Sequence, residues 1–317
     1  ILVQKNGFIL IGNASLTNDG ASCTTKLMRL TPQGAEDPTF ACPSTSSVQK
    51  IYELGNGQIL VAGIFKPDGD EGDTKYLVRL NSDGSFDNSF STGFSTFVQD
   101  FSVSSNGEIY AVGGFEFVNG LPRSGFAKLL PSGAVDPDFN VALVAQASSA
   151  SVLSVEVLKD QRVVIGGDFI EVNGVEQKFL AMVTSSGILD TTFVPQVARY
   201  TVFDNGVASP ETTAIIEQPD KRILVTGSLG SHDGSAKYLF RIDTQGEFDP
   251  EFVDGDIDLP VLDAWLDHKG DLLIGGGFSA VGEHPSGPVA LVETGIDLEP
   301  FCVILRAANG NVVNFCL

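Results

Sequence analysis

The sequence predicts an all-β repeat protein, and three observations lead to this prediction. A turn glycine of the repeat is followed six residues later by a phenylalanine at six regularly spaced places along the chain. Asn-Gly pairs separate short apolar runs, which is typical of β-hairpins. No segment keeps a helical apolar period over several turns, and glycine is abundant at 35 of 317 residues, so helix is nearly excluded.

The repeat is defined by its glycine and phenylalanine positions. The six pairs are Gly34/Phe40, Gly84/Phe90, Gly133/Phe139, Gly187/Phe193, Gly246/Phe252 and Gly295/Phe301. Five copies also place an aspartate three residues after the glycine, at Asp37, Asp87, Asp136, Asp190 and Asp249. The phenylalanines lie 50, 49, 54, 59 and 49 residues apart. Periods of this length indicate a copied supersecondary unit whose copies bury their faces against each other.

Each copy is expected to contain four short antiparallel strands. In the third copy, residues 98–104 and 108–112 form the first pair around Asn106-Gly107, and both turn residues are expected to have positive φ. A second pair follows, as around Ser82-Asp83-Gly84 in the second copy. A glycine at the end of each second strand predicts a bulge or a close backbone approach. These glycines are Gly12, Gly63, Gly113, Gly166, Gly227 and Gly275.

Tandem four-stranded units of about 50 residues predict a β-propeller. A β-solenoid is the alternative, although its rungs are usually shorter. Six full copies fill residues 1–301, and residues 302–317 resemble the first hairpin of another copy. Six or seven blades are therefore compatible with the sequence, and the abrupt first strand is expected to belong to a longer protein.

The repeated aspartates and phenylalanines are expected to be structural. An aspartate just after a turn can accept hydrogen bonds from nearby amides and lock the turn. The six phenylalanines are expected to pack between blades, where burial of each ring contributes about 2–3 kcal/mol. A catalytic site would not need five copies of its acid.

The repeat resembles the delta-60 repeat, a β-propeller-type repeat of bacterial surface and secreted proteins. The resemblance is carried by Gly-x-Phe (Gly113/Phe115, Gly167/Phe169), Val-Asn-Gly (118–120, 172–174) and the closing Asp-x-x-Phe, and it extends to Phe301. It implies an extracellular or envelope location and a binding or adhesive role. It brings no established catalytic residues.

The formal net charge of −21 argues against nucleic acid and anionic membrane surfaces as partners. The acidity either keeps a secreted protein soluble or serves to bind a divalent cation or a basic partner. No run of apolar residues has transmembrane length, so no membrane span is expected.

The four cysteines form two pairs that are symmetric about predicted turns. Cys23 and Cys42 flank the 31–34 turn, and Cys302 and Cys316 flank Asn309. Each pair would face across antiparallel strands, so we predict two disulfides and an oxidising compartment. Four free buried thiols are the alternative.

The candidate binding residues lie in insertions. Carboxylates in the 66–76 insertion could ligate calcium, the one cofactor considered, although a solvated loop is the favoured interpretation. They are Asp68, Asp70, Glu71 and Asp73. The long segment after Phe193 departs from the repeat and supplies candidate contact residues. These are Tyr200, Phe203, Asp204 and Asn205.

The sequence therefore predicts a non-catalytic, secreted or cell-surface propeller that binds a protein or glycan partner. Glycine-rich segments lack a following helix and a Gly-Lys-Ser/Thr motif, which excludes nucleotide binding. No serine-histidine-aspartate or paired-histidine pattern is present. The alternatives are a glycan hydrolase or lyase using carboxylates near the axis, and a rigid unit of a surface fibre or secretion assembly. Unlike polar residues converging on the axis would favour the enzyme.

Overall fold

The computed structural model describes residues 1–13, 26–67, 72–145, 151–198, 211–231, 236–252, 256–266, 271–281, 284–285, 287–292, 302–306 and 312–316. All regular elements in these ranges are β-strands, as the sequence predicts. Within the same ranges, no helix could cross a membrane.

Six antiparallel sheets follow one another along the chain, and each has three principal strands. The first strands are β1 (Leu2–Val3), β4 (Thr45–Glu53), β7 (Val98–Val103), β13 (Val152–Val157), β19 (Glu211–Glu217) and β22 (Val261–Leu266). The second strands are β2 (Ile9–Gly12), β5 (Ile59–Phe65), β8 (Ile109–Gly113), β14 (Val163–Gly167), β20 (Ile223–Ser231) and β23 (Leu272–Gly276). The third strands are β3 (Leu27–Leu30), β6 (Lys75–Leu80), β11 (Phe126–Leu129), β17 (Leu180–Val183), β21 (Ala236–Ile242) and β26 (Val289–Val292).

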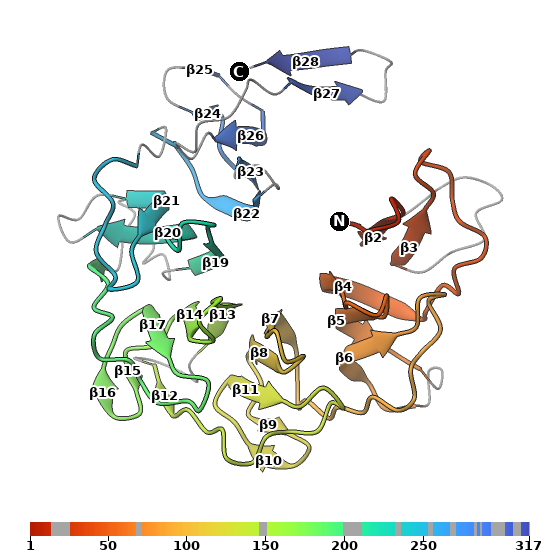
Figure 1. Cartoon of the computed structure of the whole chain (residues 1–317), viewed down its shortest axis with the longest axis horizontal. Coiled ribbons are helices and arrows are strands. Elements are labelled where there is room, and N and C mark those ends of the chain that lie inside the picture. The colour runs from red at the N-terminus through yellow and green to blue at the C-terminus, as the bar shows by residue number, and fades with distance from the viewer. Residues whose placement is uncertain are drawn as a thin grey trace, which may run out of the picture.

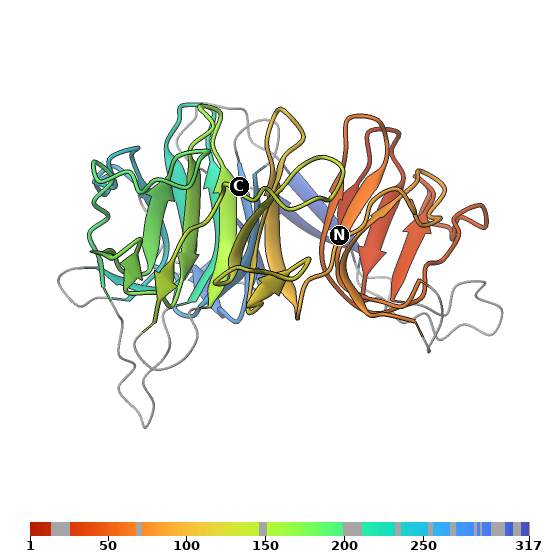
Figure 2. The same cartoon turned by 90° about the horizontal axis from the view of Figure 1, so that it is seen from below.

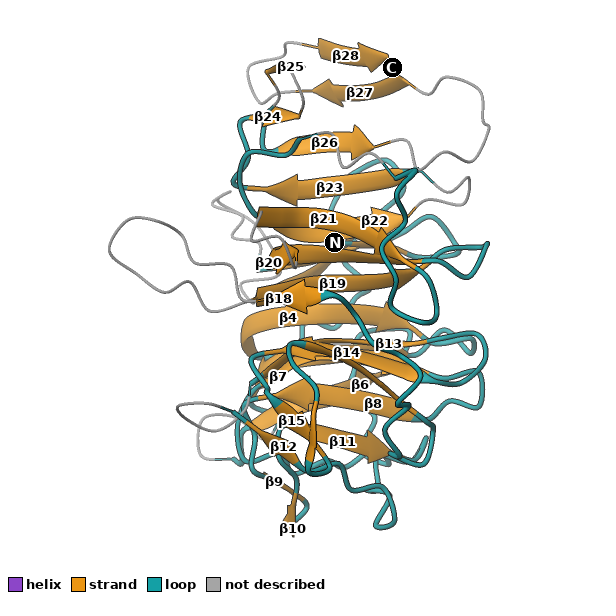
Figure 3. Ribbon diagram, turned by 90° about the vertical axis from the view of Figure 1, so that its left-hand side faces the viewer, coloured by secondary structure: helices purple, strands orange, loops and turns teal. Residues whose placement is uncertain are grey.

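The sheets are arranged as blades around a common axis (Figure 1). The first strands β4, β7, β13 and β19 lie nearest the centre, and the third strands lie toward the rim. Seen from the side, the molecule is a disc with its strands running between two faces (Figures 2 and 3). This is the arrangement expected of a β-propeller. In the described residues, the sheet β1–β2–β3 pairs with no strand from the end of the chain.

In the first five blades, the expected fourth strand is reduced to one bridge. Five such bridges follow the turn after the third strand: Leu30↔Glu36, Leu80↔Phe86, Leu129↔Val135, Val183↔Leu189 and Ile242↔Phe248. In three copies proline comes directly after the repeated aspartate, at Pro38, Pro137 and Pro250. Proline has no amide to donate to a ladder. The second and fourth copies have Asn88 and Thr191 at this position and also stop at one bridge, so proline is compatible with the short pairing but does not cause it.

The turns between first and second strands differ from the predicted type. Only the second turn residue has positive φ, as at Gly7 (85°), Gly57 (82°) and Gly107 (79°), and at Gln161 (71°) and Lys221 (72°) where glycine is absent. The Gly107 amide donates to the Ser104 carbonyl at 2.9 Å, which fits a type I turn followed by a left-handed glycine. Two positive φ angles occur instead in the Val-Asn-Gly segments, at Asn119 (50°) and Gly120 (78°).

Those Val-Asn-Gly segments form small hairpins beyond the second strands. One joins β9 (Phe117–Val118) to β10 (Leu121–Pro122), and another joins β15 (Glu171–Val172) to β16 (Val175–Glu176). β15 also pairs with β12 (Leu143–Val144) in the link that leads to the fourth blade. The remaining short strands are β18 (Val197–Ala198), β24 (Ala280–Val281), β25 (His284–Pro285), β27 (Cys302–Arg306) and β28 (Val312–Cys316).

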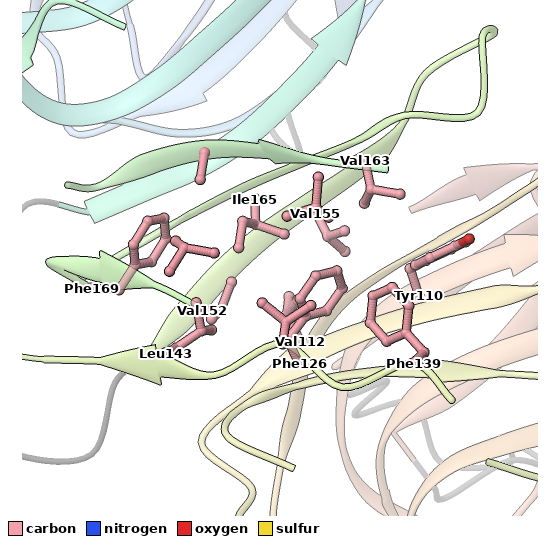
Figure 4. Packing of buried hydrophobic residues seen from close by; sticks show 14 residues of the cluster. Tyr110, Val112, Phe126, Phe139, Leu143, Val152, Val155, Val163, Ile165 and Phe169 are labelled. Atoms are coloured by element: carbon pink, nitrogen blue, oxygen red, sulfur yellow. The ribbon is translucent and has the colours of Figure 1, made fainter. Parts of the chain in front are cut away.

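The hydrophobic core lies between consecutive blades. One cluster joins Tyr110, Phe126 and Phe139 of the third blade to Val155 and Ile165 of the fourth (Figure 4). Phe126 and Phe139 meet edge to face, with ring centroids 5.0 Å apart. Comparable clusters contain the other described repeat phenylalanines, Phe40, Phe90, Phe193 and Phe252. Phe301 lies outside the described residues.

Candidate functional site

The two faces of the propeller are built from different connections. The tight turns before the second strands and after the third strands share one face, here called the turn face. A Cβ added at Gly7 would lie 3.3 Å from Pro32, and one at Gly107 would lie 3.4 Å from Pro131, so the two kinds of turn lie side by side. The opposite face, the insertion face, receives the β9–β10 and β15–β16 hairpins and the ends of the links between blades.

A groove of about 360 Å³ opens on the insertion face where three first strands begin. Its lining comes from the middle of β4, from the starts of β7 and β13 with the residues before them, and from the end of β8. The lining residues are Gln49, Thr96, Phe97, Gln99, Gly113, Gly114, Ser151, Val152 and Leu153. None of them is charged, and Phe97 is 45% exposed. A smaller groove of about 220 Å³ lies on the turn face beside Asn56, Arg79 and Pro131.

The groove wall depends on a bulge and on the glycine predicted to permit it. The ladder between β7 and β8 shifts register between Val98 and Asp100. A Cβ on Gly113 would lie only 2.2 Å from the Phe97 carbonyl oxygen, so only glycine allows this approach. The same closeness occurs at Gly63, Gly167 and Gly276. In the fourth and sixth blades the closest approach thus falls one residue after the predicted glycine.

Unlike polar side chains meet beside this groove, on the inner strands. The Lys50 ammonium on β4 lies 2.6 Å from a carboxylate oxygen of Asp100 on β7. Asp100 also accepts a hydrogen bond from the Val155 amide of β13 at 2.9 Å. The Ser102 hydroxyl donates to Glu156 at 3.1 Å and accepts from the Val157 amide at 3.1 Å. These four side chains, Lys50, Asp100, Ser102 and Glu156, form what we call the axial cluster.

The pKa of the Glu156 carboxyl, in the axial cluster, is shifted far from its ordinary value. Burial raises its pKa to about 7, even though the charge of Lys50 and the hydrogen bond from Ser102 act to lower it. The negative charges of Asp100 and Glu217 add to the rise. The pKa of Lys50 is raised: burial acts to lower it, but the carboxylates of Asp100, Glu156 and Asp263 outweigh that effect. The carboxyl of Glu156 therefore changes charge near neutral pH.

The axial cluster also protects exposed strand edges. First strands have no sheet neighbour on the axial side, so their free amides need partners. Elsewhere in the ring, Glu53 accepts from the Lys5 amide at 3.0 Å and Glu217 accepts from the Lys159 amide at 2.7 Å. Asp100 and Ser102 do the same for the edge of β13. Capping of free strand amides therefore explains Asp100 and Ser102. It does not explain the raised pKa of Glu156.

The repeated aspartates take part in a recurring set of contacts. The sequence predicted the hydrogen bonds that lock the turn but not the contacts to a cation. Asp37 accepts from the Thr39 amide at 2.9 Å, which locks the turn as expected. Its other oxygen accepts from Arg29 Nε at 2.7 Å. The Arg29 guanidinium lies over the Phe40 ring, 4.6 Å from its centroid, and also donates to the Ser82 carbonyl of the next blade. We call this arrangement of cation, aspartate and phenylalanine the clasp.

The clasp recurs around the ring. Arg79 with Asp87 and Phe90, and Arg241 with Asp249 and Phe252, repeat it with the same spacing, and Lys128 pairs with Asp136 at 3.3 Å. In the fourth blade Met182 stands at the cation position, and Arg162, directly before β14, reaches Asp190 at 3.0 Å. In the sequence, the cation of the clasp is indicated by a basic residue eight positions before the aspartate.

The predicted calcium and loop-contact residues fall largely outside the described residues. Asp68, Asp70 and Glu71 lie there, as do Tyr200, Phe203, Asp204 and Asn205. Asp73 is described. In the described ranges, no group of three or more His, Cys, Asp or Glu side chains has a geometry that could hold a metal ion. Both assignments therefore stay predictions.

The cysteines support one part of the disulfide prediction and correct another. Cys302 and Cys316 are direct cross-strand partners in the β27–β28 register, as predicted. Cys42 is not a free thiol, but it lies in the link before β4 and not on a strand, so the cross-strand argument for its pairing is wrong. The ladder ends before it because the chain turns at Asp37-Pro38. Cys23 lies outside the described residues, and both disulfides stay predictions.

Comparison with known families supports the class of fold defined by these sheets and clasps. Residues 54–90, 104–139, 158–193 and 218–252 match a family described as "Domain of unknown function (DUF5122) beta-propeller". Each matched segment ends at a repeat phenylalanine. The chain thus carries β-propeller repeats, and its narrower resemblance to the delta-60 repeat stays a prediction. The sequence matches no curated protein.

Solved structures similar to the chain have low sequence identity. One is the extracellular domain of the putative one component system BT4673 from B. thetaiotaomicron, with 12% identity and a TM-score of 0.47 over 99% of this chain and 42% of that one. Another is PorZ, a surface component of the type-IX secretion system of Porphyromonas gingivalis, with 15% identity and a TM-score of 0.42 over 78% and 34%. A streptogramin B lyase has 13% identity and a TM-score of 0.40 over 98% and 90%. The chain spans less than half of the first of these structures.

Proposed function

We propose that this chain is a non-catalytic binding module that acts outside the cell and binds a protein or glycan partner through its insertion face. The observation that carries the proposal is the difference between the two faces. The turn face consists of repeated tight turns and clasps. The insertion face carries the hairpins that follow the second strands of the third and fourth blades, and the uncharged groove between β4, β7 and β13. Binding functions are commonly placed on such connections of a rigid scaffold.

The extracellular location and the blade number belong to the same proposal. The acidity and the two predicted disulfides favour an oxidising compartment. Six three-stranded sheets are described, and we propose that the β27–β28 hairpin begins a seventh repeat. A role as a rigid unit of a larger surface assembly would use the same scaffold but would not require the groove.

The proposal is tested by blocking one face at a time. Glu176→Cys places a new thiol on the insertion face, at a side chain that is 74% exposed. Ser132→Cys places one on the turn face, in the turn between β11 and its bridge. After attachment of a polyethylene glycol chain, each variant is applied to arrays of glycans and extracellular proteins. We expect the first block to abolish retention of the ligands that the unmodified chain binds, and the second to leave it unchanged.

The opposite pattern, or retention of no ligand by the unmodified chain, would overturn the proposal. Retention lost with both blocked variants would also contradict it, because that result would place the contact outside the insertion face. Each modified variant is first checked for an unchanged unfolding transition, so that loss of binding is not loss of fold.

A second candidate function is glycan hydrolysis or lysis at the axis, and one observation favours it. Glu156 has a pKa near 7 and lies in one network with Lys50 and Asp100. A carboxyl that titrates near the working pH is suited to general acid–base catalysis. Release of new reducing ends or unsaturated products from a glycan panel, lost in Glu156→Gln, would support this candidate over simple binding.

A further inference from the structure

We infer that the insertion-face groove is a binding site for a neutral saccharide. The inference rests on the proposed function and narrows it to one class of ligand and one site. It follows from the kinds of groups that line the groove, from their free hydrogen-bonding capacity and from the absence of charge in the lining.

Phe97 supplies an apolar surface of the kind that a sugar ring can cover. Its side chain is 45% exposed, and its ring packs against Tyr76 with centroids 5.3 Å apart. The contact with Tyr76 holds the ring in place, and nearly half of the residue stays exposed at the groove. The C–H face of a pyranose packs favourably on such an aromatic surface, because both are apolar and flat.

Two amides and two hydroxyls provide the polar groups. Gln49 and Gln99 are exposed, and the Gln49 amide has only a long hydrogen bond of 3.4 Å to Ser47. Thr96 and Ser151 add hydroxyl groups to the lining. Amides and hydroxyls each offer donors and acceptors, which match the donor and acceptor roles of sugar hydroxyls.

The absence of charged residues from the lining favours a neutral ligand. No lining residue is ionised, and the nearby Lys50 and Asp100 satisfy each other at 2.6 Å. A carboxylated or phosphorylated ligand would lose water without gaining a charged partner, which is costly. The volume of about 360 Å³ lies within the range of roughly 300–1,000 Å³ typical of small-molecule sites.

Gly114 keeps the groove open. A Cβ placed on Gly114 would meet no atom within 4 Å. A larger side chain at this position would therefore fill the groove without disturbing the packing behind it. Gly277 occupies the matching position in the sixth blade, before Phe278, and is equally open. It does not line the groove, so it offers a matched control.

The test is a titration of the whole chain with maltotriose, cellotriose and N,N′-diacetylchitobiose, followed by ligand-observed NMR and calorimetry. We expect saturable binding of at least one of these sugars. Gly114→Leu should abolish it, and Phe97→Ala and Gln99→Ala should each weaken it about tenfold or more. Gly277→Leu should bind like the unchanged chain.

Three results would overturn the inference: no binding of any neutral sugar in the panel or on a neutral glycan array, binding restricted to charged glycans or proteins, or binding unaffected by Gly114→Leu. Failure of this inference is separable from failure of the proposed function. If neutral sugars do not bind but an arrayed protein is displaced by the block at Glu176→Cys, only the saccharide inference falls. If nothing is retained by the insertion face, both fall.

Discussion

At the scale of single residues, each clasp contains an ion pair beside the turn that follows the third strand, and in the first blade this pair is buried. Arg29 and Asp37 are 9% and 5% exposed, and the arginine also covers Phe40 and reaches the next blade. Burial alone would raise the pKa of Asp37, but hydrogen bonds from Thr39 and Arg29 lower it below its ordinary value. The charged form of the aspartate is therefore part of the folded state above about pH 4, and its contribution is lost as the pH falls below that range.

Removing the cation of a clasp should be far more damaging than removing an exposed one. Arg29→Met leaves Asp37 buried without its partner, so we expect a loss of about 3–5 kcal/mol in the free energy of unfolding. Lys178→Met is the control, because Lys178 and Glu176 are 49% and 74% exposed and their solvent-screened pair should contribute little to stability. Urea denaturation of both variants measures the difference. Equal, small losses would show that the clasp is not a stabilising unit.

Glu156 should make stability depend on pH in the neutral range. Its pKa is raised in the folded state, so its contribution to stability is present at low pH and is lost as the pH rises toward about 7. Glu156→Gln keeps the acceptor for Ser102 and removes the titration. We expect the variant to be more stable than the unchanged chain by about 1–3 kcal/mol at pH 8 and similar to it near pH 4. Parallel stability–pH curves for the two proteins would contradict the raised pKa.

At the scale of elements, the blade is a three-stranded sheet whose first strand is bulged against a glycine of the second strand. The glycine lets the backbone of the first strand approach, as Gly113 does at Phe97. The fourth strand ends at a single bridge both where proline follows the repeated aspartate, as after Leu129↔Val135, and where it does not, as after Leu80↔Phe86. The shape of the insertion-face groove is set by these backbone conformations and not by large side chains.

Adjacent glycines should differ sharply in their tolerance of a methyl group. Gly113→Ala forces a Cβ against the Phe97 carbonyl, so we expect destabilisation of about 1–3 kcal/mol. Gly114→Ala meets open space and should change stability by no more than about 0.5–1 kcal/mol. Thermal unfolding of the two single variants compares them directly. The bulge geometry would be wrong if both alanines were tolerated equally.

The repeat phenylalanines should hold neighbouring blades together. Phe139 is 1% exposed between the third and fourth blades, so Phe139→Ala should lower the free energy of unfolding by about 3–5 kcal/mol. Phe117→Ala, at a ring that is 45% exposed, serves as the control and should cost about 1 kcal/mol or less. Chemical denaturation distinguishes the two. Similar losses would mean that the interblade clusters do not dominate stability.

The sequence was sufficient to predict features that recur and are local. The turn glycines, the interblade phenylalanines and the bulge glycines all follow from repeated spacing. The clasp cation was missed because it precedes its aspartate by eight residues and changes identity, with Arg29 in one blade and Lys128 in another. The axial cluster was not predictable, since Lys50, Asp100 and Glu156 are unlike, lie about fifty residues apart and meet only when the blades form a ring.

At the scale of the whole molecule, one face is uniform and the other is varied. Strand direction fixes this division, because every tight turn of the repeat falls on one side and every inserted hairpin falls on the other. The inner strands connect the two, and their edges are capped by side chains from neighbouring blades, such as Asp100 on Val155. A rigid ring that presents a single variable face is well suited to binding, and the uncharged groove is the most developed feature of that face.

The most direct test of this account is hydrogen–deuterium exchange of the chain with and without an array-selected ligand. The account predicts that amide protection on binding is confined to the insertion face, in residues 96–99, 113–115 and 151–153. Protection confined to turn-face residues such as 82–84 and 104–107 would contradict it.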